Sequence, residues 1–310
     1  MVEYIDSQRR VHGVEPICTV LAEAGVAIAP SSYYAHKKTP VSTAVLEEAY
    51  LVNALVTLWA ENWGVYGVRK LWHAARRAGL DVGRDQVARL MAIGGITGAV
   101  RGRHRTRTTV RDEQALRHPD LVRRGWNAPT GIDQLWVADF SYVWTLAGFV
   151  YVAFVVDVYS RRILGWRAST SKATALVTDA LHQAMDVRHR SDSRWTATGL
   201  IHHSDAGSQY TSLALTAELI DAGIAGSIGT VGDALDNALC ESTIGLFKTE
   251  AINLSGPAWP DRRAVEWQVA RWVHWYNTTR LHSSIGHLPP IEFEHHHRQA
   301  TTVTPIPEVA

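Results

Sequence analysis

The sequence has few cysteines and no long apolar segment. Its two cysteines, Cys18 and Cys240, match neither a disulfide framework nor the spacing of a zinc site. The longest apolar run, residues 146–156, is shorter than the roughly 20 residues that a membrane-spanning helix needs. No signal-peptide pattern opens the sequence. These absences argue against a disulfide-stapled or membrane-embedded protein, and they favour a protein of the cytoplasm.

The composition is that of a folded protein with an uneven charge distribution. At 310 residues, 46% hydrophobic and 20% charged, the chain is long enough for two domains. Residues 1–127 hold 18 basic and 12 acidic side chains, a net charge of +6, whereas residues 128–310 have a net charge of −5. This asymmetry indicates one part that holds a polyanion and another that holds cations. The 12 tryptophans either pack the core or stack on a ligand.

The first 95 residues form a helical region by apolar periodicity. The pattern predicts helices over residues 14–24, 44–60, 68–78 and 84–93, with a further helix start near residue 30. The hairpin over about residues 66–93 has a glycine-containing turn and carries Arg84 and Arg89 on its second helix. This arrangement is typical of a DNA-binding helix-turn-helix. The alternative is a helical hairpin that binds nothing.

Residues 96–127 have little periodicity and much positive charge, and they predict a basic linker. Arg101, Arg103, Arg105 and Arg107 stand at alternate positions. Such a segment can follow a phosphate backbone as an extended arm. The alternative is a linker whose charges are merely solvated.

A second domain is expected over residues 128–295, including a C-terminal helix, with a tail over 296–310. Apolar runs predict strands at 135–143, 148–158, 162–168, 200–203 and 224–228. Helical patterns lie at 172–187, 210–222 and 233–250. Three meandering strands followed by alternating helices and strands predict an α/β fold with a mixed five-stranded sheet, an order that resembles the ribonuclease H-like fold.

Three acids stand at informative places in this pattern. Asp139 lies within the first strand, Asp205 ends the fourth, and Glu241 lies on the following helix. The first and fourth strands are neighbours in this topology, so the carboxylates can converge. Carboxylate oxygens suit Mg²⁺ or Mn²⁺, and two such ions assist phosphoryl displacement. Asn237 and Lys248, four residues before and seven after Glu241, line the same helix face.

The spacing and the flanking sequences resemble a known family. Asp139, Asp205 and Glu241, with 35 residues between the last two, are similar to the acid triad of retroviral-type integrases and bacterial transposases. Further segments resemble the transposases of insertion-sequence family three, in the product of their second reading frame. These segments are YGVRK (66–70), LWVAD (135–139), DVYSRRILGW (157–166), HHSDAGSQY (202–210), DNALCE (236–241), FKTE (247–250) and YNTTRLH (276–282).

The resemblance implies a metal-dependent transposase that cleaves 3′ ends of DNA and transfers the strand. It implies Asp139, Asp205 and Glu241 as catalytic metal ligands, with Lys248 as a DNA contact. Three roles are open for Asn237: it orients Glu241, it contacts DNA, or it is a structural amide. The implied partners are double-stranded DNA (terminal repeats and target) and further copies of the chain on DNA. A third implied partner is an upstream-frame protein, separate or fused, that supplies a helix-turn-helix and a leucine zipper, since no heptad run occurs in this sequence. The implied location is the bacterial nucleoid.

Two other functions remain open at this point. A regulator or relic that binds element ends without cutting them would keep the basic half of the chain. A nuclease acting on RNA–DNA hybrids would share the fold, since fold alone does not decide function. We expect the C-terminal helix over residues 261–276 to pack Trp267 inward, with Arg271 and Arg280 pointing outward. The end of this helix, residues 277–282, is expected to reach DNA.

Overall fold

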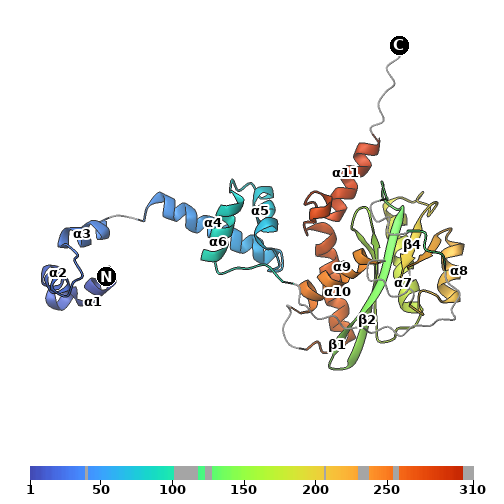
Figure 1. The fold of residues 1–310 in the computed structure, drawn as a ribbon, viewed down its shortest axis with the longest axis horizontal. Coiled ribbons are helices and arrows are strands. Elements are labelled where there is room, and N and C mark those ends of the chain that lie inside the picture. Colours follow the sequence, from blue (N-terminus) through green and yellow to red (C-terminus); the bar gives the residue numbers. More distant parts are fainter. Residues whose placement is uncertain are drawn as a thin grey trace, which may run out of the picture.

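The computed structural model describes residues 1–38, 41–100, 118–122, 128–205, 207–229, 237–253 and 258–302. Figure 1 shows three groups of elements that follow one another along the chain. Helices α1–α3 form the first group, α4–α6 the second, and a sheet with its flanking helices the third.

The first three helices have a small core of their own. They are α1 (Val2–His12), α2 (Val14–Glu23) and α3 (Pro30–Lys38). Ile5, Ile17 and Tyr33 pack together, and the Tyr33 hydroxyl donates to Asp6 Oδ1 at 2.7 Å. The expected helix over 14–24 and the helix start near 30 are confirmed. Helix α1 was not expected, because it buries only one residue, Ile5, and carries no apolar stripe.

Helices α4 (Thr43–Glu61), α5 (Val68–Arg77) and α6 (Arg84–Ile93) form the second group. Ser42 caps α4 by accepting a hydrogen bond from the Val45 N–H. Trp72 Nε1 donates to the Val82 carbonyl at 2.9 Å and so ties α5 to the turn before α6. The expected helices over 68–78 and 84–93 therefore form, as a hairpin.

No single helix in the described ranges combines the length and the apolar character needed to cross a bilayer. Helices α3 and α4 meet those criteria only when taken as a pair, with a bend of 56° between them.

The third group is built on a five-stranded sheet in the order β3-β2-β1-β4-β5. Its strands are β1 (Leu135–Thr145), β2 (Gly148–Asp157), β3 (Ile163–Ser169), β4 (Ile201–Ser204) and β5 (Ala225–Ile228). The first three strands pair antiparallel, whereas β4 pairs parallel with both β1 and β5. The mixed sheet and the ribonuclease H-like strand order expected from the sequence are confirmed.

Helices cover both faces of this sheet (Figure 1). On one face α7 (Ala175–Ser191) and α8 (Leu213–Asp221) pack on a cluster that includes Trp136 and Ala153. On the other face α9 (Ala238–Phe247) and α10 (Arg262–Thr278) pack on Val137 and Phe154. A π-helix, η1 (Lys248–Ile252), continues α9, and η2 (Ser283–Ile285) and α11 (Pro290–Thr302) follow α10.

The helix-turn-helix-like group is joined to the sheet domain through α10. Buried residues of both groups belong to one continuous apolar cluster. Trp63 stacks on Trp275 with ring centroids 5.4 Å apart. The Tyr66 hydroxyl accepts a hydrogen bond from the Leu281 N–H at 2.8 Å. The packing therefore holds the hairpin against the domain that carries the acids.

Three expectations for the C-terminal helices are wrong. Arg280 is 3% exposed and pairs with Glu250 at 2.6 Å, so it does not point outward. Asn277 is buried and exchanges two hydrogen bonds with the backbone of Ile163, so it is not on a DNA-facing surface. Trp267 is 68% exposed because it lies on the solvent face of α10.

The expected boundary between the core and the tail, at residue 295, falls inside helix α11, which runs from Pro290 to Thr302.

Candidate active site

The register of the sheet brings the two aspartates together. Strands β1 and β4 run parallel, and their last paired residues are Ala138 and Ser204. Asp139 is the next residue of β1, which continues to Thr145, and Asp205 directly follows β4, so the two carboxylates lie near each other at the edge where the pairing of β1 with β4 stops. This is the edge at which open α/β sheets bind ligands, outside the carboxyl ends of parallel strands.

The two carboxylates repel each other in a partly buried place. Burial first, and then the charges of Asp205 and Glu241, raise the pKa of Asp139 well above its usual range, although the Phe140 N–H donates to it at 2.7 Å. Burial also raises the pKa of Asp205, against the N–H of Gly207, which donates at 3.0 Å. A bound divalent cation would offset this repulsion, and carboxylate oxygens are the donors that Mg²⁺ and Mn²⁺ prefer. The donor chemistry of the pair therefore fits such an ion.

Glu241 lies near this pair without closing on it. It is an exposed residue in the first turn of α9, and its charge helps to raise the pKa of Asp139. Within the described ranges, no three His, Cys, Asp or Glu side chains are grouped closely enough to hold a metal ion. The structure thus pairs the two aspartates and leaves the glutamate at the helix surface beside them.

Asn237 connects α9 to the first aspartate. Its Nδ2 donates to the carbonyl of Ala138, the residue before Asp139, at 2.9 Å. Its Oδ1 is buried and has no hydrogen-bond partner among the described residues. Asn237 precedes the helix as its N-cap. Of the three roles open from the sequence, this contact favours the structural one, which sets where α9 begins relative to β1.

Lys248 reaches the site from the start of the π-helix. Its Nζ lies 4.9 Å from the ring centroid of Tyr142, a residue of β1. Burial lowers the pKa of Lys248, and the charge of Asp139 acts in the opposite direction. The ammonium group therefore lies within electrostatic reach of Asp139.

Two of the arginines expected to contact DNA, Arg84 and Arg89, lie on α6 and not beside the aspartates. Arg84 is exposed and pairs with its neighbour Asp85 at 2.8 Å. Arg89 is exposed and makes a two-pronged ion pair with Glu48 at 2.9 and 2.8 Å. Arg101, Arg103, Arg105 and Arg107 lie outside the described residues.

Tyr210 is a site residue that the sequence reasoning missed. It is 2% exposed, and its hydroxyl has no hydrogen-bond partner in the described part of the chain. Burial first, then the charges of Asp139 and Asp205, raise its pKa well above its usual range. The signal was present, because Tyr210 ends the motif over residues 202–210. Its buried hydroxyl lies within electrostatic reach of both aspartates.

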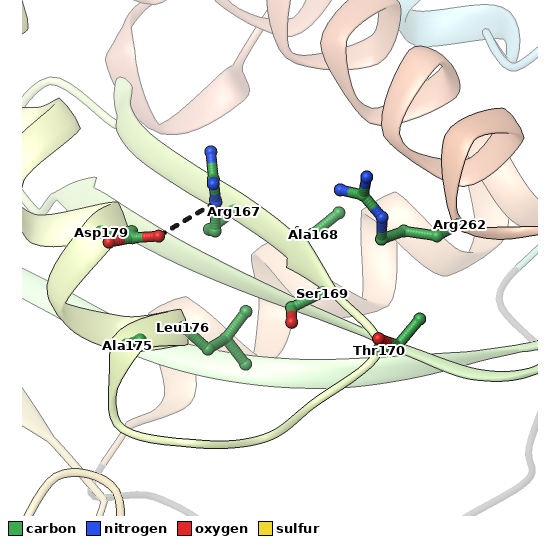
Figure 2. Close-up of a pocket in the computed structure, with 8 residues that line it drawn as sticks. All are labelled: Arg167, Ala168, Ser169, Thr170, Ala175, Leu176, Asp179 and Arg262. Carbon is green, nitrogen blue, oxygen red and sulfur yellow. Dashed lines mark ion pairs between the residues drawn. The ribbon is translucent and has the colours of Figure 1, made fainter.

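The described part of the sheet domain includes a pocket at β3 and another near Lys248. One, of about 250 Å³, lies at β3 and the start of α7, as Figure 2 shows. Its Arg167 pairs with Asp179 at 3.1 Å, and its Arg262 pairs with Glu266 at 2.9 Å. The other, of about 430 Å³, is lined by Tyr142 and Lys248 among others. Only the second pocket shares a residue with the surroundings of the aspartates.

Family models match most of the chain between residues 46 and 290. The model of an HTH-like domain matches residues 46–104. Two models of an integrase core domain match residues 129–234 and 222–290. These spans contain the hairpin of α5 and α6, and the sheet with its acids.

Several curated proteins are similar over almost their full length. The transposase for insertion sequence element IS629 of Shigella sonnei is 43% identical over 299 residues, covering 95% of each chain. The putative transposase for IS986/IS6110 of Mycobacterium tuberculosis is 46% identical and covers 86% of this chain and 95% of its own. Among solved structures, a simian T-cell lymphotropic virus intasome chain is 14% identical, with a TM-score of 0.44, over 83% of this chain and 78% of its own.

Proposed function

This chain belongs to the transposases of insertion-sequence family three, integrase-type polynucleotidyl transferases, and we propose that it cleaves the 3′ ends of its own element and transfers the strand. The proximity of Asp139 to Asp205, just beyond the last pair of β1 and β4, carries this proposal. It places two partly buried carboxylates at the sheet edge, where their repulsion favours a cation. In this proposal, a phosphodiester bound at the same edge lies between Lys248 and the two aspartates.

Asp139, Asp205 and Glu241 are the proposed metal ligands, and Mg²⁺ or Mn²⁺ is the proposed ion, with two ions when DNA is bound. Such ions activate the attacking hydroxyl and stabilise the leaving oxygen of an in-line displacement. Glu241 joins the aspartates by a small movement of the first turn of α9. The bond from Asn237 to Ala138 keeps that turn beside β1.

The remaining residues hold the DNA in this proposal. Lys248 contacts a phosphate near the cut, and Arg84 and Arg89 contact DNA from the hairpin. The basic segment over residues 101–107 follows the phosphate backbone. The chain works on terminal repeats and target DNA as a homo-oligomer in the bacterial nucleoid, with an upstream-frame helix-turn-helix and leucine-zipper protein or fusion as its partner.

A second candidate function is DNA binding without catalysis. One observation favours it: Glu241 is exposed on α9, and within the described residues it is not grouped with the two aspartates into a set of three possible metal ligands. In that case the chain would bind element ends and leave them intact.

Strand cleavage separates the two functions. A labelled duplex carrying the element's terminal repeat is incubated with Mg²⁺ or Mn²⁺ and wild type, Glu241→Gln or the control Glu266→Gln. Glu266 is a surface carboxylate on α10, so its variant should nick at the wild-type rate. We expect Glu241→Gln to bind the duplex normally and not to nick it. A wild type that binds the repeat but never nicks it, even when fused to its upstream frame, would establish the second function.

A further inference from the structure

An aromatic pocket opens beside Lys248. It has a volume of about 430 Å³ and lies between the hairpin of β1 and β2 on one side and η1 on the other. We use the name aromatic pocket for the space lined by Tyr142, Val143, Trp144, Lys248, Ile252, Asn253, Ala258 and Trp259. None of the roles proposed above uses this pocket apart from its lysine.

The aromatic side chains of the pocket are held in place but remain accessible. Trp144 is 61% exposed, and its ring meets Phe149 edge-to-face with centroids 4.8 Å apart. Tyr142 meets the same phenylalanine at 5.2 Å. The Trp259 carbonyl accepts a hydrogen bond from the Leu146 N–H at 2.8 Å, which ties the second tryptophan to the tip of the hairpin. An exposed tryptophan in a fixed position is a surface on which a planar ligand can stack.

The charge of the pocket selects the kind of planar ligand. Lys248 places its ammonium group 4.9 Å from the Tyr142 ring, and this group also lies within reach of the Asp139 charge. The Asn253 side chain adds an amide that can donate and accept at a ligand's edge. Aromatic faces, a cation and an amide together match a nucleobase with its phosphate. A π-helix at this wall is also typical of functional sites.

We propose that the aromatic pocket binds an unpaired nucleobase of the DNA end next to the cut, with the base stacked on Trp144 and Tyr142. Lys248 then lies at the phosphate of that nucleotide and Asn253 at the edge of the base. A base inside a duplex has both faces covered by its neighbours, so only an unpaired base can enter. This inference rests on the proposed function, because it assumes that DNA ends lie at the aspartates.

The test compares two duplexes of the terminal repeat, without divalent metal so that no cleavage occurs. One duplex is fully paired, and in the other the last few base pairs are mismatched, with 2-aminopurine at the terminal position. Affinity is measured by fluorescence anisotropy, and stacking by quenching of 2-aminopurine. The variants are Trp144→Ala and the control Trp267→Ala, since Trp267 is 68% exposed on α10 and outside the pocket. Thermal unfolding checks that both variants fold.

Wild type should bind the mismatched end about tenfold more tightly than the paired end, the size of effect that one stacked base gives. Trp144→Ala should lose this preference and the quenching, and Trp267→Ala should keep both. If Trp144→Ala keeps the preference, or if wild type shows neither preference nor quenching while it still nicks the repeat with Mg²⁺, the pocket inference alone is overturned. If wild type binds neither duplex, the proposed function falls with it.

Discussion

Replacing Glu294 by glutamine should destabilise the protein by about 3 kcal/mol at pH 7. Glu294 lies on α11 and is 2% exposed. Its carboxylate accepts hydrogen bonds from Arg188 at 2.8 Å on each oxygen and from Arg162 at 2.6 Å. Arg188 is 1% exposed and lies on α7, so this cluster joins the last helix to the sheet domain.

The pKa of Glu294 gives the magnitude. Burial by itself would raise this pKa, but the hydrogen bonds and charge of Arg188, with the charge of Arg162, outweigh it and lower the pKa from 4.5 to about 2. One pKa unit corresponds to about 1.4 kcal/mol, so the ionised form stabilises the fold by about 3 kcal/mol. Breaking one partner of a buried ion pair typically costs about 3–5 kcal/mol, which agrees.

The sign of the pH dependence follows from the lowered pKa. The stabilisation is complete above about pH 4.5, where the unfolded carboxyl is ionised, and is lost as the pH falls towards 2. Asp157 in the same cluster acts oppositely, because burial raises its pKa from 3.8 to about 6, so its ionisation weakens the fold as the pH rises through that range. The charge of Glu294 contributes to the raised pKa of Asp157, so the difference between Glu294→Gln and wild type at each pH reports Glu294 together with its effect on Asp157.

Urea unfolding at pH 7 and at several lower values measures this difference. The matched control is Glu292→Gln on the same helix, since Glu292 pairs with Arg77 at 2.6 Å on the surface. Exposed pairs contribute about 1 kcal/mol or less, so this variant should unfold nearly as wild type does. A loss below about 1 kcal/mol for Glu294→Gln at pH 7, or a loss equal to that of the control, would refute the electrostatic account of the cluster.

Three further predictions concern the site and the hairpin. Tyr210→Phe removes a buried hydroxyl without a described partner. The variant should have a higher melting temperature than wild type in the absence of metal, yet bind Mn²⁺ about tenfold or more weakly in calorimetry. An unchanged Mn²⁺ affinity would contradict a role of this hydroxyl in metal binding. Glu48→Gln frees Arg89 and should steepen the salt dependence of DNA binding by about one in log–log slope, whereas Arg89→Ala should flatten it. Burial, helped by the charge of Arg280, lowers the pKa of Lys70 from 10.5 to about 7. Lys70→Met should therefore raise the melting temperature at pH 6, and this gain should fade between pH 7 and 10. A gain that does not depend on pH would exclude the lysine charge as its cause.

Local patterns in the sequence were enough to predict the architecture. The order of strands and helices follows from apolar periodicity, which is a property of neighbouring residues, and the described elements agree with it closely from α4 to α10. The proximity of Asp139 and Asp205 also followed, because the first and fourth strands are neighbours and their pairing stops at the residues just before the two acids. The assignment to a transposase family rested on short motifs, which are likewise local.

Only the folded chain decided which polar side chains are buried. Arg280 and Asn277 look like surface residues in sequence, yet Glu250 and the backbone of Ile163 enclose them. Tyr210 looks like an ordinary loop aromatic, and its isolated hydroxyl becomes visible only when both aspartates lie beside it. Trp267 is exposed for the converse reason, because no described element buries that face of α10. Burial depends on which distant segment packs against a residue, and spacing along one chain does not contain that information.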